Sequence, residues 1–120
     1  DALNRHSKSL RGSRIHILGV AYKAGVNDVR ESPALNVMKI LTEKGALLSY
    51  TDPYIPTIRN EGLALDSLSL TNGYLGDIDC TVILTNHTEF DYGNVVATSR
   101  LVVDTRNALQ GFKGENIIRL

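Results

Sequence analysis

A strand, a long loop and a helix follow one another near the start of the chain, and this unit constrains the fold most. Residues 14–20, "RIHILGV", are apolar, rich in β-branched residues and closed by glycine, which is typical of a buried strand. Residues 21–32 are mixed and polar and read as a loop. Apolar side chains then recur at helical spacing up to residue 41, with Ser32 placed to cap the helix, Pro33 at its first position and Gly45 at its exit.

The rest of the chain repeats this alternation. Further extended segments are expected at residues 46–53, 65–68, 79–86, 100–107 and 115–120, the last as an edge strand. A short helix or turn is expected at 54–62, and helical segments at 72–78 and 89–99. The pattern predicts an α/β fold, namely a three-layer Rossmann-like open sheet, mainly parallel, with helices on both faces.

Composition excludes several classes of function. The chain has 13 basic and 13 acidic side chains, so no net field would gather nucleic acid or an anionic membrane. No apolar run approaches the roughly 18 residues that a membrane span needs. With the single Cys80 no internal disulfide can form, which fits a soluble protein of the reducing cytoplasm. No spacing of histidines or carboxylates suggests a metal site.

The loop after the first strand has neither of the familiar phosphate-binding fingerprints. Gly19 is followed only by Gly25, whereas a dinucleotide turn needs G-x-G-x-x-G, and a Walker A lysine is also missing. Instead the loop carries Lys23 and Arg30 close to a helix N-terminus, which favours an anion. The alternative is that both are solvated charges, with Arg30 paired to a neighbouring carboxylate.

Two more polar clusters follow later strands, where open parallel sheets bind their ligands. Arg106 comes just after "LVVD" and either contacts a ligand or pairs with Asp104. His87 follows "CTVILT" and either contacts a ligand or caps the turn. These alternatives stay open from the residues themselves.

Other chemically active residues have simpler readings. Cys80 is expected in the core and not as a nucleophile. His6 and His16 are expected to be structural, and Asp52 and Tyr54 in "TDPY" to form a turn at the end of a strand.

Three segments in order resemble a known family. "ILGVAYKAGVNDVRESPALNVMKILTEKGALLSYTDPYIP", "DCTVILTNHTEFDY" and "LVVDTRN" are similar to the C-terminal, UDP-binding domain of the UDP-glucose/GDP-mannose dehydrogenases. The resemblance runs from about Ser9 to the end. The form "AYK…DVRESPA" together with "VVDTRN" resembles the UDP-N-acetylglucosamine and UDP-N-acetylmannosamine 6-dehydrogenases more than the UDP-glucose branch.

The resemblance implies a larger enzyme. An N-terminal domain would bind NAD, a central helical region would dimerise, and residues 14–120 would form the C-terminal domain, with 1–13 as the end of the connection to it. The whole enzyme, a homo-oligomer, would oxidise the C6 alcohol of a UDP-sugar to a carboxylate in two NAD-dependent steps. The catalytic cysteine would lie in the other domains, so this chain would hold no catalytic residue and be inactive by itself.

The resemblance also implies roles for individual residues. Tyr22 and Lys23 would contact the uridine diphosphate part of the substrate, and Arg106 would contact its nucleotide. Arg30 would reach across the interdomain cleft to NAD. Two other classes remain open from the residues: a non-catalytic nucleotide-binding or regulatory module, and an interaction scaffold, which the gathering of cations at one sheet edge disfavours.

Overall fold

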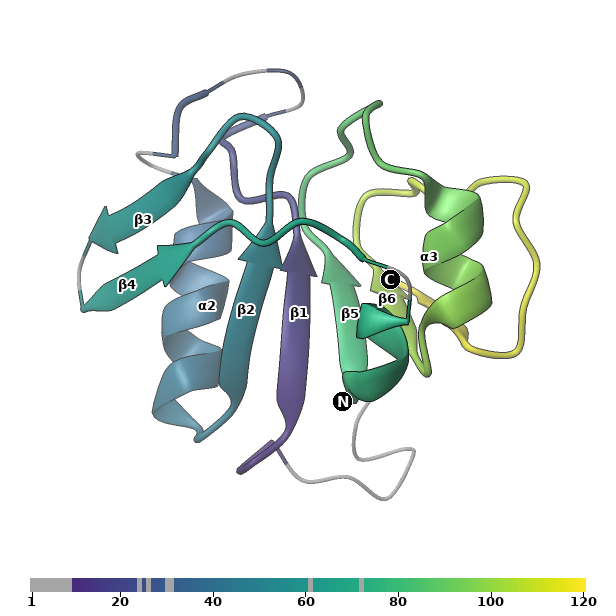
Figure 1. The fold of residues 1–120 in the computed structure, drawn as a ribbon, viewed down its shortest axis with the longest axis horizontal. Coiled ribbons are helices and arrows are strands. Elements are labelled where there is room, and N and C mark those ends of the chain that lie inside the picture. Colours follow the sequence, from purple (N-terminus) through teal and green to yellow (C-terminus); the bar gives the residue numbers. More distant parts are fainter. Residues whose placement is uncertain (1–9, 24, 26, 30–31, 61, 72) are drawn as a thin grey trace.

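A single five-stranded parallel sheet organises the chain (Figure 1). The computed structural model describes residues 10–23, 25, 27–29, 32–60, 62–71 and 73–120. The strand order is β2-β1-β5-β6-β7. The strands are β1 (Arg14–Leu18), β2 (Leu47–Thr51), β5 (Cys80–Ile83), β6 (Val102–Asp104) and β7 (Ile117–Arg119).

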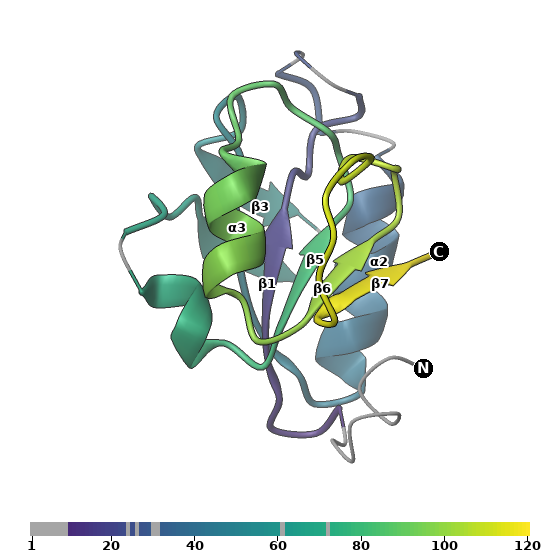
Figure 2. The same ribbon diagram turned by 90° about the vertical axis from the view of Figure 1, so that its right-hand side faces the viewer.

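Helices cover both faces of this sheet (Figure 2). Helix α2 (Pro33–Glu43) lies on one face, and helix α3 (Tyr92–Thr98) and the short 3-10 helix η1 (Tyr74–Asp77) lie on the other. Because side chains alternate along a strand, Ile15 and Ile17 join the core under α2 while Leu18 joins the core under α3. The predicted three-layer, mainly parallel α/β fold is therefore confirmed, including the edge position of the last strand.

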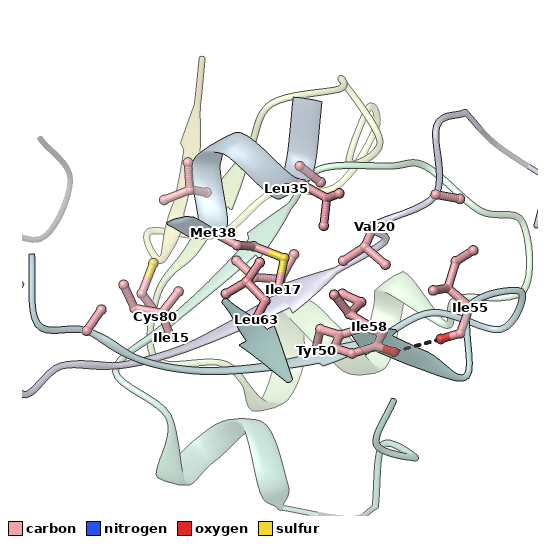
Figure 3. Packing of buried hydrophobic residues seen from close by; sticks show 14 of the residues in the cluster. Ile15, Ile17, Val20, Leu35, Met38, Tyr50, Ile55, Ile58, Leu63 and Cys80 are labelled. Atoms are coloured by element: carbon pink, nitrogen blue, oxygen red, sulfur yellow. Dashed lines mark hydrogen bonds between the residues drawn. The ribbon is translucent and has the colours of Figure 1, made fainter. Parts of the chain in front are cut away.

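The core beneath α2 is closed by a small element that sequence patterns predicted only in part, as the extended segment expected at residues 65–68 (Figure 3). Strands β3 (Thr57–Asn60) and β4 (Leu63–Asp66) form an antiparallel hairpin, so the short helix or turn expected at residues 54–62 is wrong. Its buried side chains Ile58 and Leu63 pack in the same cluster as Met38 and Tyr50. With only four residues in each strand, the period-two pattern is too short to be recognised, and packing against the core decides the conformation.

Helix α2 forms as its sequence predicts. The side chain of Ser32 caps it by accepting a hydrogen bond from the Ala34 amide at 3.2 Å, and Pro33 occupies the first turn. The helix ends at Glu43, two residues before Gly45. Cys80, expected in the core, is 2% exposed there, and burial raises the pKa of its thiol to about 12, which leaves it protonated and unreactive.

A chain of hydrogen bonds crosses the α3 face of the sheet through the buried His16. Tyr74 Oη donates to Ser49 Oγ at 3.0 Å, and Ser49 Oγ lies 2.7 Å from His16 Nδ1. His16 Nε2 lies 2.8 Å from Thr51 Oγ1, which donates to Leu68 O at 2.6 Å. With each group in the chain donating to the next, Ser49 donates to Nδ1 and Nε2 donates to Thr51, so the imidazole carries one ring proton and is neutral. Burial lowers the pKa of His16 from 6.5 to about 4. His16 is structural, as expected.

This buried neutral histidine should make the domain sensitive to mild acid. Above pH 6.5 His16 is neutral in both states, but between 6.5 and about 4 only the unfolded chain takes up the proton. At 1.36 kcal/mol for each pH unit, about 3 kcal/mol of stability should be lost over that interval. Urea unfolding of the wild type and His16→Asn at several pH values tests this. On acidification the free energy of unfolding should fall more steeply in the wild type than in His16→Asn. Parallel plots of this free energy against pH would refute the assignment of His16 as a buried neutral imidazole.

Candidate functional site

Three loops meet at the carboxyl edge of the sheet because of the strand order. Strand β1 lies between β2 and β5, so the loops that follow β2 and β5 flank the loop that follows β1. The β1 loop approaches the β5 loop most closely at Gly19, where an added Cβ would lie 2.4 Å from Thr85 O. The Gly19 amide donates to Thr51 O at 2.9 Å. The β1 loop is therefore held against both of its neighbours.

Asp52 is the centre of this junction, although it is 3% exposed. Its Oδ2 accepts hydrogen bonds from the amides of Val20 and Ala21 at 2.8 and 3.0 Å, and its Oδ1 accepts one from the Tyr54 amide at 2.8 Å. The expected turn at the end of the strand is confirmed by the last of these bonds. The other two bonds join the turn to the β1 loop, which sequence patterns did not predict.

His87 completes the junction from the β5 side. Its Nδ1 accepts a hydrogen bond from the Gly25 amide at 3.0 Å. Because a backbone amide can only donate, Nε2 carries the ring proton and donates it to Asp52 Oδ2 at 2.9 Å. His87 is completely buried, so it joins loops and does not face a ligand. Joining two loops is a role different from the two left open for it, contacting a ligand or capping the turn.

The junction explains why a dinucleotide fingerprint is missing. In a dinucleotide-binding turn, free amides after the first strand approach a pyrophosphate. Here the amides of Val20 and Ala21 already bind the Asp52 carboxylate, and the space beside Gly19 is filled by the Thr85 backbone. The described residues of this loop do not fit a pyrophosphate cradle.

A pocket of about 310 Å³ opens beside the junction, between the β1 loop, the start of α2 and the ends of β5 and β6. We call it the Arg106 pocket. Tyr22, half exposed, supplies an aromatic surface, and Arg106 supplies a cation on the β6 side. The full lining is Ala21, Tyr22, Ser32, Pro33, Ala34, Val37, Leu84, Thr85, Thr105 and Arg106.

The chemistry of the Arg106 pocket suits a ligand with an aromatic ring and an anionic group. Tyr22 and the apolar side chains of Val37 and Leu84 can pack against a base, while Arg106 can pair with a phosphate. No described residue forms a hydrogen bond or ion pair with the Arg106 guanidinium. The start of α2 adds its dipole only, because the Ala34 and Leu35 amides already donate to Ser32.

Not every residue expected at the site lines this pocket. Tyr22 and Arg106 do, whereas Lys23 is exposed on the same loop but is absent from the lining. Arg30 lies outside the described residues. Asp104 accepts hydrogen bonds from the amides of Arg106, Ala108 and Leu109 at 2.8–3.0 Å, so it fixes the β6 loop and leaves the guanidinium free of it.

A second hollow, of about 690 Å³, lies between the β4–η1 segment and the start of α3. We call it the acidic hollow, because Glu89 and Asp91 are exposed on it and its lining contains no lysine, arginine or histidine. A diphosphate would be repelled there. Although this hollow is the larger, the Arg106 pocket is the better candidate for an anionic ligand.

The described residues hold neither a metal-ion cluster nor a membrane-spanning helix. Among them, no group of three or more histidine, cysteine, aspartate or glutamate side chains is placed to hold a metal ion. No helix in the described part of the chain has the length and apolar character needed to cross a membrane.

The fold and the pocket define an open α/β domain with its ligand site at the carboxyl edge of a parallel sheet. Residues 16–111 match the model of the UDP-glucose/GDP-mannose dehydrogenase family, UDP binding domain. The chain belongs to this family and forms its UDP-binding domain.

Individual relatives come from both branches of the family. A UDP-N-acetyl-D-mannosamine dehydrogenase of Methanococcus maripaludis is 34% identical over 105 residues, which is 81% of this chain and 23% of the relative. A UDP-glucose 6-dehydrogenase of Rickettsia bellii is 33% identical over 121 residues, which is 92% of this chain and 27% of the relative. The chain therefore spans about a quarter of the length of the curated relatives it matches.

Solved structures share the fold. The chain superimposes on a UDP-D-ManNAc dehydrogenase from Pyrococcus horikoshii with a TM-score of 0.75 and 24% identity, covering 98% of this chain and 27% of that one. At this identity the likeness concerns the fold only.

Proposed function

We propose that the Arg106 pocket binds the uridine diphosphate part of a UDP-sugar. The observation that carries this is the meeting of Tyr22 and Arg106 around one pocket at the carboxyl edge of the sheet. The base packs against Tyr22 and the apolar wall, and the diphosphate pairs with Arg106. Lys23, exposed next to Tyr22 in the sequence, adds a second cation for the phosphates.

The chain acts as one part of an NAD-dependent UDP-sugar 6-dehydrogenase. In this proposal residues 1–13 end an interdomain connection and residues 14–120 form the substrate-nucleotide domain. The other domains of a cytoplasmic homo-oligomer supply the catalytic cysteine and the main NAD site. That division agrees with the start of the β1 loop, where Asp52 occupies the amides of Val20 and Ala21.

NAD contributes hydride transfer when it is bound to the enzyme. On this chain only Arg30 is assigned to it, reaching across the cleft as the family resemblance implies. The substrate sugar belongs to the N-acetylhexosamine branch by the form of "VVDTRN". Identities of 34% and 33% to members of the two branches do not separate them.

Charge removal at the pocket tests the proposal. In isothermal titration of the folded chain, UDP should bind weakly, because other domains complete the cleft. Arg106→Ala and Lys23→Ala should each weaken binding, Arg106→Ala by about tenfold, since a charge-assisted bond to phosphate is lost. Lys44→Ala removes the same charge at the opposite end of α2 and should leave the affinity unchanged. Equal losses of UDP affinity in all three variants would mean that binding depends only on the net charge of the chain.

Substitution of Arg30 distinguishes a contact with NAD from a contact with UDP. Arg30→Ala should leave UDP binding nearly unchanged and raise the NAD concentration that the full-length enzyme needs. Loss of UDP binding with an unchanged NAD requirement would place Arg30 at the substrate instead.

A further inference from the structure

The segment that presents Tyr22 and Lys23 has no regular structure of its own. Among its described residues, 20–23 and 25, none belongs to a helix or strand, and both side chains are exposed. Its conformation is held by a hydrogen bond within its own loop, from the Tyr22 amide to Asp28 O, and by contacts with other loops. One of them is made by Ala21, whose carbonyl accepts a hydrogen bond from Thr85 Oγ1 at 2.9 Å.

The Asp52–His87 pair holds this segment at both ends. Asp52 Oδ2 accepts from the amides of Val20 and Ala21, just before Tyr22. His87 Nδ1 accepts from the Gly25 amide at 3.0 Å, two residues after Lys23. The two anchors are joined to each other by the 2.9 Å bond between His87 Nε2 and Asp52 Oδ2. One buried pair thus fixes the two ends of the ligand-facing segment.

Packing fixes the histidine itself. The ring centroids of Tyr54 and His87 lie 5.1 Å apart. Those of Phe90 and His87 lie 5.6 Å apart, in an edge-to-face arrangement. Tyr54 Oη in turn donates to Glu89. Because His87 is completely buried, it acts on a ligand only through the segment that it holds.

We propose that Asp52 and His87 are positioning residues that hold residues 20–23 and Gly25 in the nucleotide-binding conformation before the ligand arrives. The proposal rests on the function proposed above. A segment ordered in advance loses less conformational entropy when it binds. The Asp52–His87 pair, which we call the clamp, therefore increases the affinity for the nucleotide without touching it.

Two substitutions of His87 separate its two hydrogen bonds. A glutamine amide reaches as far as His87 Nε2 and can still donate to Asp52, but it offers no acceptor at the position of Nδ1. An asparagine carbonyl lies near the position of Nδ1 and can accept from Gly25, but it does not reach Asp52. His87→Gln therefore releases the segment, whereas His87→Asn keeps its far end attached.

The expected result is a split between the two variants. His87→Gln should weaken UDP binding by about fivefold and speed amide exchange of Gly25 measured by NMR, while thermal unfolding shows that it remains folded. His87→Asn should retain slow Gly25 exchange and bind UDP more tightly than His87→Gln, even if it is less stable. Wild-type UDP affinity in His87→Gln, or equal Gly25 exchange in wild type and both variants, would overturn the proposal.

Failure of the function proposal gives a different pattern. If wild-type chain does not bind UDP, the nucleotide assignment is wrong, and Gly25 exchange then decides on the clamp. Faster exchange in His87→Gln than in His87→Asn would support it, and identical exchange would refute it.

Discussion

Replacing Asp52 by asparagine should lower the free energy of unfolding by about 3 kcal/mol or more. The carboxylate accepts hydrogen bonds from three backbone amides and from His87 in a site sealed from water. An amide of the same shape turns its NH₂ group toward at least one of these donors, which leaves a buried donor unpaired. Urea denaturation followed by circular dichroism measures the loss, and a chain too unstable to show a folded baseline would agree with it.

Asp66→Asn is the matched control. Asp66 pairs with Arg59 at 2.8 Å on the hairpin surface, where both side chains are more than half exposed. Such a pair contributes less than about 1 kcal/mol. If Asp52→Asn cost no more than this control, Asp52 would not be the centre of the junction.

Replacing Gly19 by alanine should be at least as damaging, with an expected loss of about 4 kcal/mol or failure to fold. Gly19 has a φ of +84°, and its added Cβ would lie 2.4 Å from Thr85 O and 2.6 Å from Thr85 Cβ. The obstacle is backbone, so neither loop can yield without breaking the junction.

Gly111→Ala separates the cost of left-handed backbone strain from the cost of the overlap with Thr85. Gly111 also has a positive φ, of +90°, but a Cβ there would meet nothing within 4 Å. This variant should lose only about 1 kcal/mol, from left-handed strain. Similar losses in both variants, again by urea denaturation, would show that the close approach to Thr85 is unimportant.

The architecture was largely predictable because its signals are local. The buried strand at 14–18 and the helix after Ser32 combine long apolar patterns with capping residues, and both form as expected. In the β3–β4 hairpin, β3 was not predictable and β4 was predicted only in part by the extended segment at 65–68, because strands of four residues depend on packing against Tyr50 and Met38. Patterns within a short segment do not contain that information.

The candidate site was predictable only in part. Of the four residues predicted for the site, Tyr22 and Arg106 line one pocket, Lys23 is absent from its lining, and Arg30 lies outside the described residues. The bond between Asp52 and His87 was not predictable, because residues 35 positions apart meet only once the order β2-β1-β5 is known. Each does stand just after a buried strand, and that shared position is the signal that could have paired them.

Mapping where UDP binds tests the central claim most directly. Amide NMR spectra of the isotope-labelled chain during UDP titration should show shifts concentrated at Tyr22, Thr85 and Thr105, around the Arg106 pocket. Arg106→Ala should reduce these shifts at equal UDP. Shifts confined to Ser69 and Phe90 in the acidic hollow, or none in a folded chain at millimolar UDP, would contradict the account.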